Sequence, residues 1–113
     1  MSLPKDLVAA SATPIVLSIL SHGDNYGYAI IEEVRRISGG ELEWADGMLY
    51  PILQRLEKKK CVTSYHEVAE NGRKRKYYRV TRDGLAELDK QRKNWNGLHE
   101  ILPELGGDQE CFN

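Results

Sequence analysis

Residues 47–60 read GMLYPILQRLEKKK, and this short basic stretch decides the fold. Its apolar side chains recur at helical spacing, so we predict a helix over residues 46–60 with one buried face. The buried face consists of Leu49, Ile52, Leu53 and Leu56. The other side is polar and basic, with Gln54, Arg55, Lys58 and Lys59. This division predicts that the helix packs on a core and presents a basic surface outward.

The charge of the chain is divided unevenly around this stretch. The net charge is −1 over 113 residues. Residues 51–82 nevertheless hold ten Lys/Arg against three Glu, a net charge of +7. The remainder holds six basic and fourteen acidic residues, a net charge of −8. A basic middle with acidic flanks is typical of a protein that meets a polyanion on one side, so the low overall charge does not exclude nucleic acid as a partner.

The stretch before residue 46 predicts two further helices. Residues 7–21, LVAASATPIVLSILS, form the first: either Thr13 caps a helix that begins at Pro14, or one longer helix begins near Asp6 and bends at Pro14. We predict a second helix over residues 26–38, capped by Asp24 or Asn25 and ended by two glycines at 39–40. Its predicted buried stripe is Gly27, Ile30, Val34 and Ile37.

The stretch after residue 60 predicts a hairpin and a last helix. Residues 61–68 and 75–81 are rich in β-branched and aromatic side chains, and Asn71-Gly72 between them indicates a hairpin turn. Thr81 is the predicted cap of a helix over residues 82–102, ended by Pro103 and the glycines at 106–107. Three helices followed by a basic hairpin predict an α+β, mostly α protein: a winged helix-turn-helix domain followed by one C-terminal helix.

This order predicts which side chains face DNA. In a winged helix-turn-helix the third helix enters the major groove and the hairpin, or wing, lies along the neighbouring backbone or minor groove. Gln54 could hydrogen-bond adenine and Arg55 guanine, while Lys58 is predicted to contact phosphate. On the wing, the basic run at residues 73–76 and the alternation of Arg75, Tyr77 and Arg79 along one strand predict a face that grips phosphates.

Pro51 has two compatible explanations. If Ala45 or Asp46 is the N-cap, Pro51 lies near the end of the first helical turn or just past it, where the lost hydrogen bond matters less. Alternatively, Pro51 lies with Gly47 on the face opposite the core, where its compact ring would allow a DNA backbone to approach closely.

Four segments together resemble the PadR family of transcriptional regulators: residues 24–34 (DNYGYAIIEEV), 46–59 (DGMLYPILQRLEKK), 70–81 (ENGRKRKYYRVT) and 81–84 (TRDG). The chain departs from the family pattern at Met48, where a hydroxyl residue is usual, and at Lys60-Cys61-Val62 after the third helix. The resemblance implies a homodimeric repressor that binds an inverted-repeat operator and leaves DNA when a small molecule binds. The predicted DNA-binding residues are Tyr26, Gly47, Met48, Tyr50, Pro51, Gln54, Arg55, Lys58, Arg73, Lys74, Arg75 and Lys76.

The resemblance also implies a dimer built by the first and last helices, with Trp95 matching a tryptophan at the dimer centre of the multidrug-responsive members. Leu85, Leu88, Trp95 and Leu102 share a heptad seam, which Arg92 and His99 interrupt. Trp95 is either an interface anchor or a platform for a flat aromatic effector, and both explanations stay open. The predicted effector-binding residues are Leu7, Ser11, Pro14, Gln91, Arg92, Trp95 and His99.

Three segments follow from these elements and from the resemblance: a DNA-binding domain over residues 1–81, a dimerisation helix over 82–104 and a flexible tail over 105–113. The two cysteines, Cys61 and Cys111, belong to no metal-binding or redox motif, and their role stays open. We expect no cofactor, metal, enzyme activity or membrane span, and a cytoplasmic location. The alternative function is a winged-helix module for protein contacts without sequence-specific DNA binding.

Overall fold

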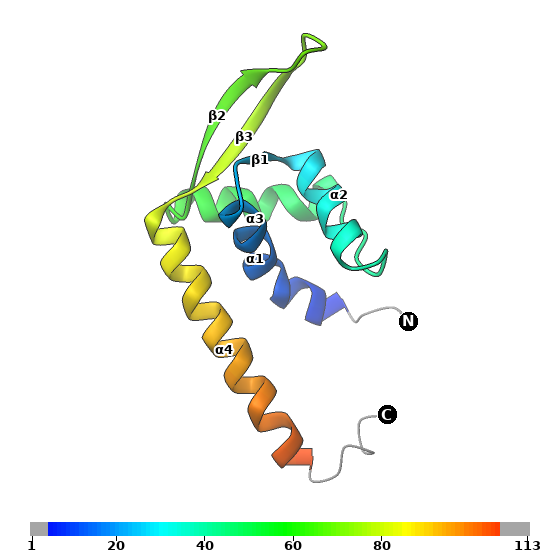
Figure 1. The fold of residues 1–113 in the computed structure, drawn as a ribbon, viewed down its shortest axis with the longest axis vertical. Coiled ribbons are helices and arrows are strands. Elements are labelled where there is room, and N and C mark those ends of the chain that lie inside the picture. The colour runs from blue at the N-terminus through cyan, green and yellow to red at the C-terminus, as the bar shows by residue number, and fades with distance from the viewer. Residues whose placement is uncertain (1–4, 107–113) are drawn as a thin grey trace.

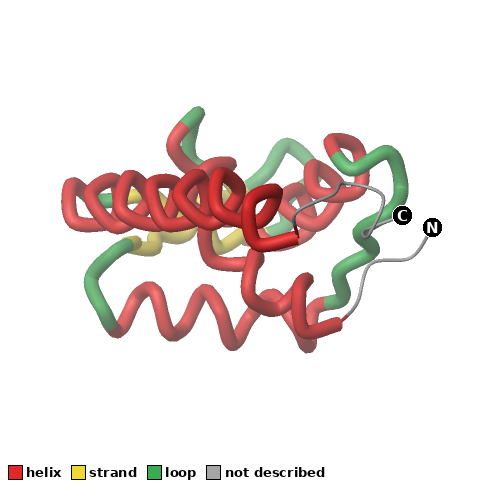
Figure 2. The backbone as a smooth tube through the Cα atoms, turned by 90° about the horizontal axis from the view of Figure 1, so that it is seen from below, coloured by secondary structure: helices red, strands yellow, loops and turns green. Residues whose placement is uncertain are grey.

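The computed structural model describes residues 5–106 and consists of four helices and a small sheet (Figure 1). The elements are α1 (Lys5–Ser21), β1 (Asn25–Tyr26), α2 (Gly27–Ile37), α3 (Asp46–Lys58), β2 (Val62–Val68), β3 (Lys74–Val80) and α4 (Arg82–Gly106). Seen from below, most of the backbone is helical (Figure 2). The predicted class, mostly α with a winged hairpin, is confirmed.

The core lies between α1, α2 and α3 and is closed by the base of the sheet. Leu17, Ile30 and Leu53, one from each helix, have no exposed surface. Val62 and Tyr78 close the core from β2 and β3, and Leu88 does so from α4. The apolar face predicted for α3 is therefore the face that the structure buries, with Leu49, Ile52, Leu53 and Leu56 all in the core.

The wing is an antiparallel pair with Val62 opposite Val80 and Val68 opposite Lys74. Its turn contains Asn71-Gly72 as predicted: the Gly72 N–H donates to the Ala69 carbonyl at 2.9 Å, and Gly72 has a φ of 82°. A left-handed residue at the end of a short hairpin loop favours glycine. The short strand β1 pairs with β3 and makes the order β1-β3-β2, an addition that the sequence did not predict.

The first two helices differ in part from those predicted from the sequence. α1 is one helix with Pro14 inside it, as in the second of the two alternatives. α2 begins after Tyr26, without a side-chain cap, because the Asn25 side chain accepts from the Tyr26 N–H and Asp24 bonds to the wing. Ile37 is 54% exposed and is not part of the buried stripe.

α4 begins as predicted but ends later. Thr81 caps it, because its hydroxyl oxygen accepts from the Gly84 N–H at 3.0 Å. The helix continues through Pro103 to Gly106, the first of the two glycines predicted to stop it, so it extends past the predicted end near residue 102 and into the segment predicted as tail from residue 105. The rest of the predicted tail, including Cys111, lies outside the described residues. The wing and the far end of α4 extend from opposite ends of the molecule (Figure 1).

Candidate nucleic-acid interface

The outer face of α3 is exposed over its length. Ala45 is the N-cap, and its carbonyl accepts from the N–H groups of Met48 and Leu49 at 3.0 and 3.1 Å. Pro51 therefore lies just past the first turn, and the helix continues through it. The exposed residues among those predicted to face DNA are Gly47, Tyr50, Pro51, Gln54, Arg55 and Lys58. The Leu49 N–H already donates to the Ala45 carbonyl, so residue 51 lies within the regularly bonded helix and the first explanation of Pro51 is not supported. Pro51 is exposed with Gly47, as the second explanation requires.

Met48 differs from the other residues of the predicted set on α3. It is half-buried and packs against the core cluster, at the edge of the exposed face. It also lines a hollow on the side of α1 and the loop before α3, together with Trp44. The structure therefore does not bring Met48 onto the face that holds Gln54 and Lys58.

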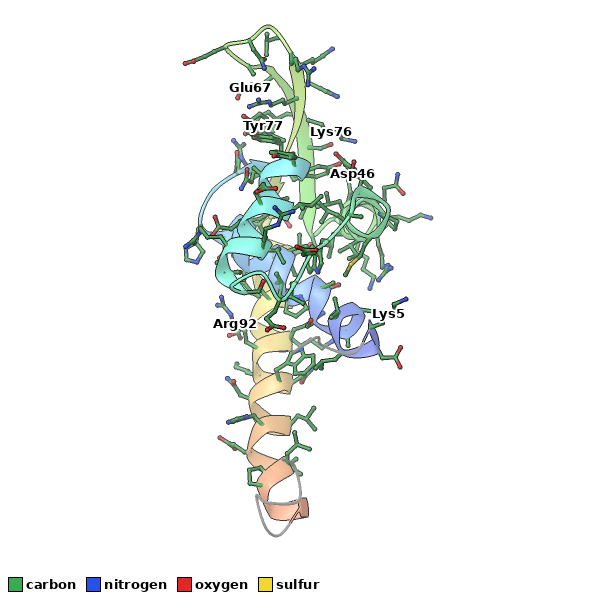
Figure 3. The ribbon with its side chains drawn as sticks, turned by 90° about the vertical axis from the view of Figure 1, so that its right-hand side faces the viewer. Lys5, Asp46, Glu67, Lys76, Tyr77 and Arg92 are labelled. Atoms are coloured by element: carbon green, nitrogen blue, oxygen red, sulfur yellow. The ribbon has the colours of Figure 1, made fainter. Side chains whose placement is uncertain are left out.

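Lys76, in the basic run of the wing, lies on the same side of the molecule as the start of α3. Figure 3 shows Lys76 on the wing and Asp46 at the start of α3 on that side. Arg73, Lys74 and Lys76 are exposed. Arg75 is half-buried, with its guanidinium carbon 4.4 Å from the centre of the Tyr26 ring. An arginine over an aromatic face is held in one orientation while its outer edge stays free to donate.

A hollow of about 460 Å³ joins the wing to the helix-turn-helix. Six of its lining residues belong to the predicted DNA-binding set: Tyr26, Tyr50, Arg73, Lys74, Arg75 and Lys76. The other two, Gly27 and Tyr28, were missed by the sequence reasoning. Tyr28 is 65% exposed, and the Y-G-Y triplet at the start of α2 was the available signal. A hollow lined by four cations and three phenols has the chemistry to hold phosphate oxygens.

One face of the wing is covered by a stack of aromatic and arginine side chains. Tyr65 and Tyr77 lie face to face with ring centres 5.6 Å apart, and Tyr26 meets Tyr77 edge-on at 5.3 Å. Arg75 covers the Tyr26 end, and Arg79 lies 5.2 Å from the centre of the Tyr65 ring. Tyr77 therefore packs on the wing itself and Tyr78 is buried in the core.

Asp24 holds the Arg79 end of this stack. Its Oδ2 accepts from the Tyr65 hydroxyl at 2.6 Å and from the Arg79 Nε at 2.9 Å, and Arg79 Nη2 lies 2.9 Å away as well. Hydrogen bonds from Arg79 and then Tyr65 lower the pKa of the Asp24 carboxyl. The hydrogen bond to Asp24 raises the pKa of Tyr65. Arg79 is thus paired within the protein, although its side chain stays 62% exposed, and its predicted place on a phosphate-gripping face stays a prediction.

The predicted effector residues are brought together only in part. A shallow hollow of about 320 Å³ between α1 and α4 is lined by four of them: Ser11, Pro14, Arg92 and Trp95. The Arg92 guanidinium donates to the Ser18 hydroxyl at 3.0 Å across this hollow. The three others, Leu7, Gln91 and His99, do not line it. Gln91 instead donates to Glu87 on its own helix.

Within residues 5–106, no group of three or more His, Cys, Asp or Glu side chains is arranged to hold a metal ion. In the same range, no helix combines the length and the apolar character that crossing a bilayer requires. Cys61 is a buried free thiol, and burial raises its pKa.

The comparison with known families decides the identity. The profile described as the transcriptional regulator PadR-like family matches residues 16–90, from α1 into α4. This chain belongs to the PadR-like family. The match spans the whole helix-turn-helix and wing described above, and it confirms the resemblance found in the sequence. This PadR-like protein is therefore a DNA-binding transcriptional regulator and not an enzyme.

Individual relatives agree with the family. An uncharacterized protein of Lysinibacillus sphaericus is 34% identical over 97 residues, which cover 86% of this chain and 89% of the relative. The solved structure of a transcriptional regulator from Clostridium thermocellum aligns with a TM-score of 0.81 at 28% identity, over 88% of this chain and 97% of that chain. A PadR family transcription regulator from Clostridium difficile aligns with a TM-score of 0.74 at 29% identity, over 84% of this PadR-like protein and 97% of that chain.

Proposed function

We propose that this protein is a homodimeric repressor that binds an inverted-repeat operator with α3 and the wing, and that a small aromatic or hydrophobic effector releases it. The observation that carries the proposal is the continuity of one exposed surface, from Gln54 and Arg55 on α3 to the cationic hollow beneath the wing. In this arrangement Gln54 and Arg55 contact bases, and Lys58 with residues 73–76 contacts phosphates. A repressor acts on the chromosome, so a cytoplasmic location is part of the proposal.

The apolar surface of α4 supports the dimer. Leu85, Leu98, Ile101 and Leu102 are each 45–50% exposed, and most of them lie on the part of the helix that extends from the domain. A helix with large exposed apolar side chains is stabilised by covering them, and a symmetric partner helix is the simplest cover. Residues 82–106 would then form the dimerisation helix, packed with α1 of each protomer. Two recognition helices on one dimer account for an operator with two half-sites.

The hollow between α1 and α4 supports the effector. It is lined by Trp95 and lies between the two helices that would build the dimer. A ligand bound there would change the angle at which the two protomers pack. The indole and Pro14 offer apolar surface, and Arg92 offers a cation. We propose that a flat aromatic molecule binds there and changes the spacing of the two α3 helices. Equal spacing in free and ligand-bound dimers would contradict this mechanism.

The test is a selection of duplexes from a random pool by the full chain, followed by fluorescence anisotropy on the selected duplex and on a scrambled one at several salt concentrations. Mass measurement in solution gives the stoichiometry. A repressor binds the selected duplex as a dimer and far more tightly than the scrambled one. Equal, weak and strongly salt-dependent binding to both duplexes would instead favour the protein-contact module with an incidental basic wing.

A further inference from the structure

The carboxylate of Asp24 joins the wing to the helix-turn-helix. Asp24 lies in the turn between α1 and β1, whereas its two partners lie 41 and 55 residues further along the chain, on β2 and β3. Its side chain is 26% exposed, so the three groups meet in a partly shielded site. Charged hydrogen bonds of this kind are directional, so they hold Tyr65 and Arg79 in one place relative to the helices.

The ion pair sets Arg79 apart from the other cations of the wing. Within the described residues, Arg73, Lys74, Arg75 and Lys76 have no salt-bridge partner, whereas Arg79 is paired at 2.9 Å. An arginine with a free guanidinium beside a DNA-binding surface would add attraction to the phosphates of any duplex, whatever its sequence. Because Asp24 pairs with Arg79, Arg79 adds little of this sequence-independent attraction.

The aromatic stack extends the effect of Asp24 across the wing. From the Asp24 end the order is Arg79, Tyr65, Tyr77, Tyr26 and Arg75. Asp24 bonds to the first two members, and the last two line the hollow beside Tyr50. Fixing one end of a packed row fixes the other, so the position of Arg75 relative to α3 depends on Asp24.

We propose that Asp24 is a positioning residue that determines the specificity of DNA binding: it neutralises Arg79 and anchors the stack, so that the wing meets DNA through Arg75 and the tip in fixed register with α3. The inference rests on the proposed function. It explains why an acidic side chain lies under a basic wing, where it lowers the attraction to DNA in general. In return, Asp24 raises the ratio of the affinity for the operator to the affinity for other duplexes, because a wing in fixed register with α3 binds best to the matching sequence.

Asp24→Asn tests the proposal, and Asp89→Asn is the matched control. Asp89 pairs with Lys93 at 3.0 Å on the exposed side of α4, so the control removes the same charge and also breaks one ion pair. Affinities are measured by anisotropy at several salt concentrations, on the duplex selected by the natural protein and on a scrambled duplex. Both variants are first shown to fold by their thermal unfolding.

For Asp24→Asn we expect binding to the selected duplex to weaken about fivefold and binding to the scrambled duplex to strengthen about twofold, so the ratio falls about tenfold. On the scrambled duplex the slope of log K against log salt should steepen by about 0.9, the value for one added phosphate contact. Asp89→Asn should change neither affinity beyond about twofold. Equal weakening on both duplexes, or identical behaviour of the two variants, would overturn the proposal.

Arg79→Gln gives an independent test that does not depend on the folding of the Asp24 variant. Because Arg79 is paired with Asp24, its loss should leave the salt slope on the scrambled duplex unchanged. A slope shallower by about 0.9 would show that Arg79 contacts phosphate in the natural protein, and the proposal would be wrong. If the natural protein discriminates between duplexes and Asp24→Asn keeps that ratio, this inference alone fails. If the natural protein selects no duplex, the proposed function fails and this inference fails with it.

Discussion

The hydroxyl oxygen of Tyr50 lies 2.6 Å from the position that a Cβ atom would take at Gly27. Gly27, the first residue of α2, and the exposed Tyr50 ring of α3 are therefore so close that a residue with a Cβ atom would not fit without a shift. The ring is held beneath the wing in the cationic hollow, which Gly27 also lines. Among residues 5–106 the phenol of Tyr50 has no hydrogen-bond partner, so this close approach to Gly27 is what places it.

Gly27→Ala should move the Tyr50 ring and leave the fold intact. The clash involves the far end of a side chain that is 40% exposed, so rotation of the ring relieves it. We expect a change of less than about 1 kcal/mol in the free energy of unfolding, because alanine also favours the helix. DNA affinity should fall about fivefold if Tyr50 contacts a phosphate. In a Tyr50→Ala background the same substitution should have no further effect on binding, and a persisting effect would assign another cause.

Gly84→Ala should damage the fold itself. A Cβ atom there would overlap the backbone carbonyl of Cys61 and lie 2.7 Å from Val80 Cγ2. The obstacle is mainly backbone, so the start of α4 must separate from the base of the wing. We expect a loss of about 3 kcal/mol in the free energy of unfolding, at the upper end of the range for overpacking, measured by urea titration.

Gly97→Ala is the matched control for that measurement. It lies in the same helix, and an added Cβ meets nothing within 4 Å. It should therefore stabilise the helix by about 0.5–1 kcal/mol. Changes of opposite sign in the two variants would show that the space at the glycine, and not helix propensity, decides the result.

Substitutions in the recognition helix α3 and in the wing should change DNA binding in different ways. Arg55→Ala should change the preferred base at one position of each half-site, at a cost of about 1–3 kcal/mol in discrimination. Arg73→Gln with Lys74→Gln should weaken binding to every duplex and reduce the salt slope by about 0.9 for each phosphate lost. Lys90→Gln on α4 removes a cation away from this surface and is the control. If the wing variant has the same salt slope as the natural protein, Arg73 and Lys74 do not contact phosphates and the wing is not part of the DNA interface.

The Asp24 ion pair predicts a specific acid sensitivity. The pKa of the carboxyl in the folded state lies below its ordinary value of 3.8. Its contribution to stability is therefore fully present above about pH 4 and is lost as the pH falls through the lower, folded-state pKa. Asp24→Asn should be less stable than the natural protein at pH 6, and the difference should shrink between about pH 4 and pH 2 in urea titrations. If the difference in the free energy of unfolding between the two proteins stays constant over this range, the variant is destabilised by altered packing and not by loss of the ion pair.

Local patterns predicted most of the fold. The spacing of Leu49, Leu53 and Leu56 decides which face of α3 is buried, and Asn71-Gly72 decides the turn, because each signal lies within a few residues. Ile37 also matched the helical spacing but lies at the end of α2 beyond the core, and only the packed structure shows this. Pro103 was predicted to help end α4, because proline loses a hydrogen bond and clashes with the carbonyl four residues earlier, yet α4 continues past it to Gly106.

The site was predicted less completely, for a physical reason. Residues of α3 and the wing tip could be assigned by type and position along the chain. The bonds of Asp24 to Tyr65 and Arg79 join segments far apart in sequence, and nothing local distinguishes Asp24 from a helix cap. The pairing of β1 with β3 is equally distant, so the stack on Tyr26 could not be foreseen. Contacts of this range depend on the folded register of the wing.

Trp95→Ala should separate the two explanations of Trp95. If the indole is a ligand platform, the variant stays a folded dimer that binds the selected duplex within about threefold of the natural protein, and it loses at least about tenfold in affinity for a flat aromatic probe. Anilinonaphthalene sulfonate is a suitable probe, since its sulfonate can meet Arg92 in the same hollow. Trp95→Phe keeps an aromatic ring and should lose less.

The measurement combines probe fluorescence with mass in solution. Quenching of Trp95 is followed in a Trp44→Phe background, which leaves one tryptophan of the two. That background breaks no hydrogen bond within the described residues, because the Trp44 indole nitrogen is buried without a partner there. A Trp95→Ala chain that unfolds or becomes monomeric would identify Trp95 as an interface anchor. The effector would then have to act elsewhere, and the hollow between α1 and α4 would be part of the packing of the dimer.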